Sequence, residues 1–293
     1  MKPLVIYHAD CTDGFAAAFA AWLKLGDEAH YCAMAYSGKD VPEWRDQEVY
    51  ILDFSFPRPV MDAIFAEAKR VVWLDHHKTA FEMWEAKFPY HFEKDGADDE
   101  KYIVLDNDKS GALLAWEHFH PNKEVPMLIR HIDDRDRWQF KLEGSKEIHA
   151  TLHSYKPWNF EQWRKLFNSY EAAPGHFLTA GLAVLRAQDQ HVAQIVKQAR
   201  RCHMVYTDDL NRDKRGLAVN SPIHQSEIGQ ELANQSGTFG LVWHLGADFR
   251  VKCSLRSNEE YDVSAIAKAF GGGGHRNAAG FETDVQTLME WLR

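Results

Sequence analysis

The sequence has few cysteines, and no two of them are close together. They are Cys11, Cys32, Cys202 and Cys253, and no pair forms a Cys-x-x-Cys motif. Disulfide frameworks in small domains and cysteine-type zinc sites both rely on closely spaced cysteines. The spacing therefore argues against both.

Long hydrophobic runs are also missing. The longest one, residues 14–23, is about half as long as the ~20 apolar residues that a membrane-spanning helix needs. The first residues, MKPLVIYHAD, reach His8 and Asp10 after only a few apolar side chains, which is not typical of a secretion signal. We expect a cytoplasmic protein without a membrane partner.

The chain has no excess of positive charge. Its formal net charge is −9, and nearly all of the acidic excess lies in residues 1–199. Proteins that bind long nucleic acids usually carry a broad basic surface, so we expect no long nucleic acid as a partner. A short nucleotide held by a few arginines or through metal ions remains compatible with this charge.

What is present is an ordinary globular composition, with 45% hydrophobic and 26% charged residues in a chain of 293. Two domains are typical of this length. In the first third, short and continuously apolar runs alternate with helical patterns, which predicts a parallel α/β sheet. The apolar runs are residues 4–7, 49–52, 71–74 and 103–105, and the helical patterns cover 14–24, 61–68 and 110–119.

Residues 160–200 form a helical pattern that is broken at Ala173-Pro174-Gly175. The runs after it are shorter and partly alternating, which predicts a smaller mixed α/β lobe. Its strands are expected at 204–206, 217–219, 241–244 and 250–255, and its helices near 227–234 and 263–270. We therefore predict an α/β protein with a first domain at 1–155, a helical connector at 156–200 and a second domain at 201–293.

Ionisable side chains follow three of the predicted strands. Residues 8–14 read His-Ala-Asp-Cys-Thr-Asp-Gly, residue 53 is an aspartate, and residues 75–77 read Asp-His-His. Taken alone, the first segment is better explained by aspartates that cap a helix. Because sites in open α/β sheets form where the strands end, the repetition favours a metal site. Carboxylates with imidazoles suit Mn²⁺, Mg²⁺ or Zn²⁺, and the predominance of carboxylates favours Mn²⁺.

Two further segments carry charge or glycine. Residues 129–138 hold three aspartates among three arginines, which a solvated ion-pair network also explains. Residues 270–281 read Phe-Gly-Gly-Gly-Gly-His-Arg-Asn-Ala-Ala-Gly-Phe. Bare backbone amides bind phosphate oxygens, although a flexible linker is the simpler alternative. Arg256, at the end of a predicted strand, can make a bidentate contact to phosphate.

Asp75-His76-His77 together with residues 271–280 resembles the DHH phosphoesterase superfamily with its DHH-associated C-terminal domain. That group includes RecJ-type exonucleases, nanoRNases, pAp phosphatases and dinucleotide phosphodiesterases. The resemblance extends over nearly the whole chain. It implies that residues 1–155 are the metal-binding catalytic domain and that residues 201–293 bind the substrate.

The resemblance also implies a first metal site, which departs from the family pattern. Asp53 resembles the carboxylate that bridges two metal ions, and His8 with an acid of the first motif would complete this site. The family usually has Asp-x-Asp there, but the earlier aspartate is replaced by Cys11. Either Asp10 takes its place from one position away, or Cys11 itself binds the metal. We expect two Mn²⁺ or Mg²⁺ ions, one of them weakened or exchanged for another metal.

The second metal site would consist of Asp13, His76 and an acid from residues 133–136. Asp134 matches the family's Asp-x-x-Arg-aromatic pattern best, with Asp133 and Asp136 as alternatives.

The resemblance further implies catalytic and substrate-binding residues. Asp75 is expected to orient His76, and His77 to face the scissile phosphate. The residues expected to hold the substrate are Arg256, Gly272, Gly273, Gly274, His275 and Arg276.

These expectations describe a metal-dependent phosphoesterase that acts on short nucleotides such as oligoribonucleotides, linear dinucleotides or pAp. A hydroxide activated by the metals would attack the phosphorus, with an action resembling that of a 3′-5′ exonuclease. The alternatives are a hydrolase of polyphosphate or pyrophosphate, and a nucleotide-binding module without turnover if Cys11 disables one metal site. The sequence is compatible with a homodimer.

Overall fold

A computed structural model of the chain describes residues 2–9, 11–35, 41–84, 90–94, 100–204, 215–258 and 260–293. The chain divides into two compact units, Met1–Leu185 and Arg186–Arg293. Among the described residues, no helix combines the length and the apolar character needed to cross a membrane.

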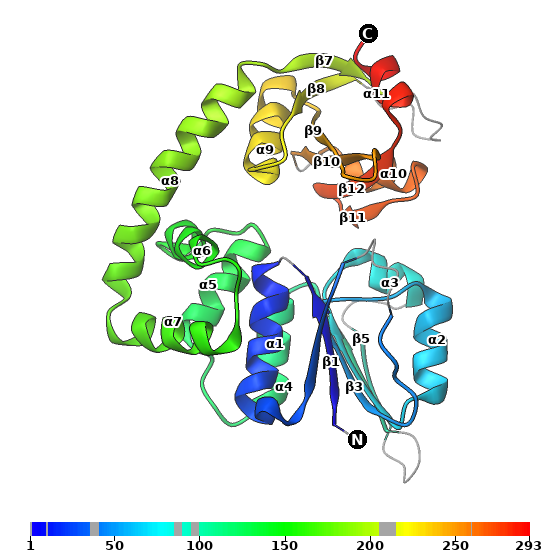
Figure 1. The fold of residues 1–293 in the computed structure, drawn as a ribbon, viewed down its shortest axis with the longest axis vertical. Helices are drawn as coiled ribbons and strands as arrows, with labels where there is room; N and C mark the ends of the chain where they lie inside the picture. The colour runs from blue at the N-terminus through cyan, green and yellow to red at the C-terminus, as the bar shows by residue number, and fades with distance from the viewer. Residues whose placement is uncertain are drawn as a thin grey trace. The chain divides into compact units, whose positions relative to one another are not determined.

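The first unit is built on a six-stranded sheet with the order β2-β1-β3-β4-β6-β5 (Figure 1). All neighbouring strands run parallel except β5, which pairs antiparallel with β6. The strands are β1 (Leu4–His8), β2 (His30–Met34), β3 (Glu48–Leu52), β4 (Arg70–Asp75), β5 (Tyr90–Lys94) and β6 (Glu100–Leu105). The four predicted strands are confirmed. The two edge strands, β2 and β5, were missed, because an edge strand such as β2 has no continuous buried run.

Helices cover both faces of this sheet (Figure 1). Strand side chains alternate between the faces, so that Val5 and Leu52 pack toward one helical layer while Ile6 and Ile51 pack toward the other. The first layer contains α1 (Thr12–Leu25), α4 (Gly111–Phe119), α5 (Met127–Asp136), α6 (Ser145–Ser154) and α7 (Phe160–Ala172). The second contains α2 (Arg58–Glu67) and α3 (Lys78–Trp84). A short 3₁₀ helix, Gly26–Glu28, follows α1.

Helix α8 (Pro174–Val196) begins in the first unit and ends in the second. Helix α7, just before it, packs into the first core through Trp163, Leu166 and Tyr170. The functional division at residues 155 and 200 remains a prediction.

The second unit has a mixed six-stranded sheet with the order β11-β12-β10-β9-β8-β7, in which only β8 and β9 pair in parallel. Its strands are β7 (Arg200–His203), β8 (Arg215–Asn220), β9 (Phe239–Leu245), β10 (Val251–Ser257), β11 (Gly273–His275) and β12 (Ala278–Thr283), and its helices are α9 (Gln225–Ser236), α10 (Val263–Ala269) and α11 (Val285–Trp291). The predicted fold class, a parallel α/β lobe with a smaller mixed lobe, is confirmed.

Two segments of this unit differ from expectation. The strand expected at 204–206 lies earlier, since β7 ends at His203, and residues 205 and 206 lie outside the described residues. The glycine-rich segment was expected to be a loop, but it forms the hairpin β11–β12. A Cβ on Gly272 would lie 2.1 Å from the carbonyl oxygen of Gly280. Glycine therefore lets the two backbones approach each other closely.

Candidate metal centre

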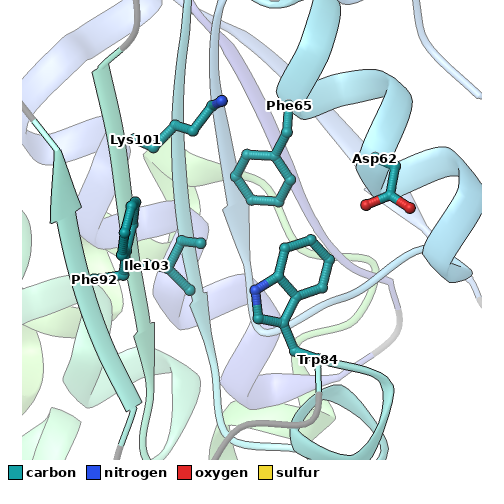
Figure 2. Close-up of a pocket in the computed structure, with 6 residues that line it drawn as sticks. All are labelled: Asp62, Phe65, Trp84, Phe92, Lys101 and Ile103. Atoms are coloured by element: carbon teal, nitrogen blue, oxygen red, sulfur yellow. The ribbon is translucent and has the colours of Figure 1, made fainter. Parts of the chain in front are cut away.

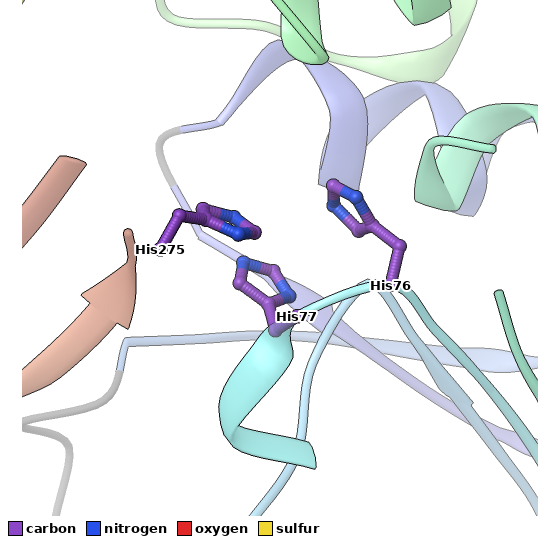
Figure 3. Close-up of side chains that lie close together, drawn as sticks. All are labelled: His76, His77 and His275. Carbon is purple, nitrogen blue, oxygen red and sulfur yellow. The ribbon is translucent and has the colours of Figure 1, made fainter. Parts of the chain in front are cut away.

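The carboxyl ends of β1, β3 and β4 meet at one edge of the first sheet, because these strands are neighbours and run parallel. His8 ends β1, Asp53 follows β3, and Asp75 ends β4. Figure 3 shows the imidazoles of His76 and His77, which come between β4 and α3, and whose ring centroids are 4.7 Å apart. The strand-end side chains thus come together as predicted.

Within the first unit, three groups of potential metal ligands form at this edge, and one of them is Asp53, Asp75 and His77. The cysteine group consists of His8, Cys11 and Asp53, and the carboxylate group consists of Asp13, His76 and Asp136. Within each group the ligand atoms lie within 4.8 Å of one another. Asp53 lies between the cysteine group and the carboxylate group, because its Oδ1 is 3.0 Å from His76 Nε2 and its Oδ2 is 3.6 Å from His8 Nδ1. A carboxylate in this position could be shared by two cations.

Asp13 is held by the first turn of α4. One of its oxygens accepts a hydrogen bond from the amide of Gly111 at 2.7 Å, and the other from the amide of Ala112 at 2.9 Å. These amides are among those that a helix leaves without partners at its N-terminus, where a carboxylate is also favoured by the helix dipole. Asp13 and α4 thereby fix each other across almost a hundred residues of sequence.

Close packing sets the residue type at two helix starts. A Cβ on Gly111 would lie 2.4 Å from the Cβ of Asp53, and a Cβ on Gly14 would lie 2.4 Å from the carbonyl oxygen of His8. Asp53 itself has a φ of 54°, a left-handed conformation that Asp tolerates better than most residues. At this edge, glycine is thus required at residues 14 and 111 for the backbone to pass close to His8 and Asp53.

The three aspartates of α5 have different roles. Asp133 pairs with Arg137, with Oδ2 2.9 Å from Nη2, and also accepts a hydrogen bond from the amide of Ser110 at 2.7 Å. Asp136 lies beside His76, with Oδ2 3.5 Å from Nε2. Asp133 therefore braces α5 against the start of α4, while Asp136 faces the ligand groups.

Asp134, which the sequence favoured as a ligand, is directed elsewhere. Its carboxylate accepts hydrogen bonds from the amides of Lys141 and Leu142 and from the hydroxyl of Ser145. These bonds close the turn that follows α5. The geometry thus favours Asp136 over Asp134 as the candidate ligand, and the ligand set stays a prediction. The other predicted ligand of uncertain position, Asp10, lies outside the described residues.

Asp75 contacts the imidazole of His77, whereas the sequence predicted that it orients His76. Its Oδ1 lies 2.7 Å from His77 Nδ1 and also accepts hydrogen bonds from the amides of residues 76 and 77. A carboxylate at Nδ1 fixes the tautomer and the orientation of the ring. His77 therefore presents Nε2 as the nitrogen that can interact with a ligand.

The buried charges strongly affect one another. Burial raises the pKa of Asp13 well above its usual range, and the charges of Asp53 and Asp136 raise it further. Burial also raises the pKa of Asp136. For Asp53 burial acts in the same direction, but the imidazoles of His76 and His8 outweigh it and hold the pKa below its usual range. The neighbouring acidic groups therefore disfavour one another's charged forms, and a bound cation would favour those charged forms.

These residues fit divalent cations. Asp53 is only 1% exposed, and although His76 Nε2 lies 3.0 Å from its Oδ1, neither carboxylate oxygen accepts a hydrogen bond of normal geometry from the described residues. A buried carboxylate in this situation is unfavourable unless a cation or a donor compensates for the lost hydration. The oxygen and nitrogen donors nearby are the usual ligands of Mn²⁺, Mg²⁺ and Zn²⁺. Bound cations would supply the missing compensation.

Residues at the start of α4 contribute to the centre, but sequence reasoning did not identify them. Ser110 caps α4 through its hydroxyl, and Gly111 holds Asp13 and leaves room for Asp53. One feature of the sequence could have indicated these residues. Ser110 and Gly111 come after strand β6, just as the other site residues come after their strands.

In the second unit, the candidate substrate-binding residues make contacts with other elements of the same unit. Arg256, on β10, donates hydrogen bonds to the hydroxyl of Ser226 at 2.7 Å and to the carbonyl of Leu255 at 2.8 Å. The amide of Gly272 donates to the carbonyl of Ala267 and so closes the end of α10. Gly273, Gly274 and His275 pair with β12, and the carbonyl of Arg276 accepts from the amide of Val263. The amide of Gly272 thus serves helix α10 and the next two glycines lie in the hairpin, which the phosphate-binding expectation did not foresee.

A small recess of about 220 Å³ lies between the second helical layer and the sheet edge (Figure 2). It is lined by Asp62, Phe65, Trp84, Phe92, Lys101 and Ile103. The guanidinium of Arg58 lies 4.0 Å from the ring centroid of Trp84. The recess shares no residue with either ligand group and is no part of the metal centre.

Comparisons with known proteins agree with the resemblance seen in the sequence. The DHHA1 domain matches residues 216–293. The uncharacterized protein R106 of Acanthamoeba polyphaga mimivirus is 32% identical over 297 residues, which cover 94% of this chain and 66% of that protein. Oligoribonuclease NrnB of Bacillus subtilis (strain 168) is 22% identical over 214 residues, which cover 72% of this chain and 52% of that protein. The chain thus spans about two thirds and about half of the length of these relatives.

Two solved structures also match along most of their length. The pGpG-specific phosphodiesterase PggH from Vibrio cholerae has 14% identity and a TM-score of 0.48, with coverage of 98% of this chain and 95% of that chain. An uncharacterized protein from Helicobacter pylori G27 has 16% identity and a TM-score of 0.40, with coverage of 97% and 94%. These matches identify residues 216–293 as a DHHA1 domain and support the DHH phosphoesterase superfamily for the chain.

Proposed function

We propose that this protein is a metal-dependent phosphoesterase that hydrolyses short nucleotides, with oligoribonucleotides as the favoured substrates. The observation that carries the proposal is the buried Asp53 carboxylate, which lies between two groups of ligand side chains and accepts no hydrogen bond of normal geometry from the described residues. The similarity to an oligoribonuclease supports the substrate class.

In this proposal His8, Asp53 and a residue of the first motif hold one ion, while Asp13, His76 and Asp136 hold the other, with Asp53 shared. Two divalent cations there would act as Lewis acids on the phosphoryl oxygens and supply a nucleophile from water. The first turn of α4 keeps Asp13 in place through the amides of Gly111 and Ala112. The protein thus determines the separation of the ligands before any substrate binds.

His77 is proposed to bind the scissile phosphate through Nε2. Burial lowers the pKa of His77, but the neighbouring Asp75 carboxylate outweighs this effect and raises the pKa above its usual value. The imidazole therefore remains protonated to higher pH than an ordinary histidine. A protonated ring can donate a hydrogen bond to a phosphoryl oxygen, whose negative charge increases in the transition state.

The second unit is proposed to bind the rest of the nucleotide through Arg256, His275 and Arg276. Arginine suits this role because its planar guanidinium makes bidentate contacts to phosphate. Because several amides of the glycine segment are engaged within the hairpin, we assign phosphate binding to the side chains in preference to Gly272 or Gly273. The domain limits at residues 155 and 200 belong to this proposal.

The test uses metal-stripped protein supplied with Mn²⁺ and a panel of pApA, a five-nucleotide RNA, pAp and tripolyphosphate, with products separated by chromatography. We expect release of mononucleotides from pApA or the short RNA, loss of activity with chelator, and no activity in His76→Ala. Phosphate release from tripolyphosphate alone would contradict the substrate class. No turnover on any substrate while Mn²⁺ is bound would contradict the enzyme and favour a nucleotide-binding module.

A further inference from the structure

The two ligand groups differ in chemistry. The carboxylate group offers two oxygens and one imidazole nitrogen, whereas the cysteine group offers an oxygen, a nitrogen and the sulfur of Cys11. Sulfur, nitrogen and oxygen donors in one group favour cations that accept soft ligands. The sulfur of Cys11 is therefore the donor atom that would set the metal preference of the cysteine group.

Helix capping does not explain Cys11. It occupies the N-cap position of α1, with φ −106° and ψ 135°, but its side chain makes no capping hydrogen bond. Ser, Thr, Asp and Asn are strongly preferred at this position, because their side-chain oxygens accept such a bond. The backbone carbonyl of Cys11 does accept a bond from the amide of Phe15 at 3.0 Å, a contact that any residue could provide.

Core packing does not explain Cys11 either. The side chains of Cys202 and Cys253 are buried in the apolar core of the second unit, and Cys32 packs against a core of the first. Cys11 is half-buried and, within the described part of the chain, belongs to none of the apolar clusters. Its thiol instead faces a histidine and an aspartate.

The second observation concerns Asp53, which faces the same point from another strand. Its carboxylate is 1% exposed, and its Oδ2, 3.6 Å from His8 Nδ1, accepts no hydrogen bond of normal geometry from the described residues. A buried acceptor without such a bond indicates that a positively charged ligand belongs there. The thiol of Cys11 and the carboxylate of Asp53 thus point to one cation between them.

We propose that Cys11 binds a divalent cation as a thiolate, together with His8 and Asp53, and that this site prefers Zn²⁺, Co²⁺ or Fe²⁺ over Mn²⁺ and Mg²⁺. The carboxylate group retains the preference of an oxygen-rich site for Mn²⁺ or Mg²⁺. When the sulfur–metal bond forms, the thiol proton passes to solvent, and no oxidation takes place. This proposal rests on the proposed function, since both require metal at the ends of β1 and β3.

The test is a titration of the metal-stripped, reduced full-length protein with Co²⁺, followed by absorption spectroscopy. A thiolate bound to Co²⁺ gives an intense sulfur-to-metal charge-transfer band in the near ultraviolet, separate from the weak visible bands that any bound Co²⁺ shows. We expect this band in the wild type, its complete loss in Cys11→Ser, and retention of the visible bands from the carboxylate group. Cys32→Ser is the matched control and should keep the band.

A second variant tests the metal preference. Cys11→Asp replaces sulfur with the carboxylate of the usual family pattern, and it should lower the ratio of Zn²⁺ affinity to Mn²⁺ affinity at this site, because a thiolate favours Zn²⁺ more strongly than a carboxylate does. Circular dichroism establishes that both Cys11 variants are folded. An unchanged ratio of affinities in Cys11→Asp would overturn the proposed preference.

The outcomes separate this proposal from the proposed function. Visible Co²⁺ bands in the wild type without a near-ultraviolet band, or a band that persists in Cys11→Ser, would overturn thiolate ligation and leave the phosphoesterase proposal standing. Failure of Co²⁺, Zn²⁺ and Mn²⁺ alike to bind the wild type would overturn both proposals.

Discussion

In the first unit, β1, β3 and β4 run parallel and end at one edge, whereas in the second unit β9, β10 and β12 are antiparallel neighbours. The parallel sheet brings together side chains from His8 to Asp136, although more than a hundred residues of sequence separate them. In the second unit, Arg256 of β10 donates a hydrogen bond to Ser226 of helix α9, and the glycine segment pairs with β12. The first arrangement suits a preorganised reactive centre, and the second suits a binding surface.

This comparison predicts that substitutions in the first unit lower kcat, while those in the second raise KM. The largest effect is expected from Asp53→Asn, which keeps the shape of the side chain but removes the charge shared by the two ligand groups. Activity with Mn²⁺ should fall on the order of a thousandfold or more, and bound metal, measured by atomic emission, should fall with it. Asp62→Asn, on the exposed face of α2, is the control. Full metal content in Asp53→Asn would contradict the role of the first unit as the metal-binding unit.

The next largest effect concerns the pair Asp75 and His77. His77→Ala should lower kcat by roughly a hundredfold, the range for a group that assists proton or charge transfer, and should leave metal content unchanged. In Asp75→Asn the carboxylate that raises the pKa of His77 is absent. The limb of the pH–rate profile that requires the protonated ring should therefore move to lower pH. A profile identical to that of the wild type would contradict the role of Asp75.

A smaller effect is expected from Arg256→Ala in the second unit. Loss of a charge-assisted contact to phosphate should raise KM by about tenfold to a hundredfold, corresponding to ~1.5–3 kcal/mol. Steady-state kinetics on a short RNA should show little change in kcat. Arg250→Ala, in the turn before β10, is the matched control. A fall in kcat at constant KM would show that Arg256 takes part in the reaction itself. The division of roles between the two units would then be wrong for this residue.

The smallest effect on activity is expected from Asp134→Ala, which should affect folding. Burial would raise the pKa of Asp134, but hydrogen bonds from Ser145 and from the amides after α5 lower it. A lowered pKa in the folded state gives stability above pH ~4 that is lost as the pH falls through the folded pKa. Thermal unfolding at neutral pH should show a loss of about 2 kcal/mol. At low pH the variant and the wild type should converge, and metal binding should be retained.

The sequence was sufficient to place most of the candidate metal centre, because continuous apolar runs mark the buried strands and the residues after them lie at one edge. The choice between Asp134 and Asp136 could not be made in this way. It depends on α5 ending at Asp136 and on a turn whose amides capture Asp134. Those contacts belong to the tertiary structure and leave no periodic pattern in the sequence.

The edge strands and the glycine hairpin were missed for related reasons. β2 is half exposed and lacks an apolar run. The glycines of residues 271–274 look like a ligand-binding loop in the sequence, because bare amides are typical of one. In the structure the amides of Gly271 and Gly272 close α10. Only the packing of the hairpin against that helix reveals where these hydrogen bonds go.

Gly111 matters for the interpretation of genetic variants. Ranked by helix propensity, Gly111→Ala would count as an improvement of about 1 kcal/mol, since alanine is the best helix former. It adds one methyl group and touches neither charge nor polarity. Yet the new carbon would lie 2.4 Å from the Cβ of Asp53. The carboxylate of Asp53 would have to move. A change that looks benign in the sequence would therefore disturb the candidate metal centre.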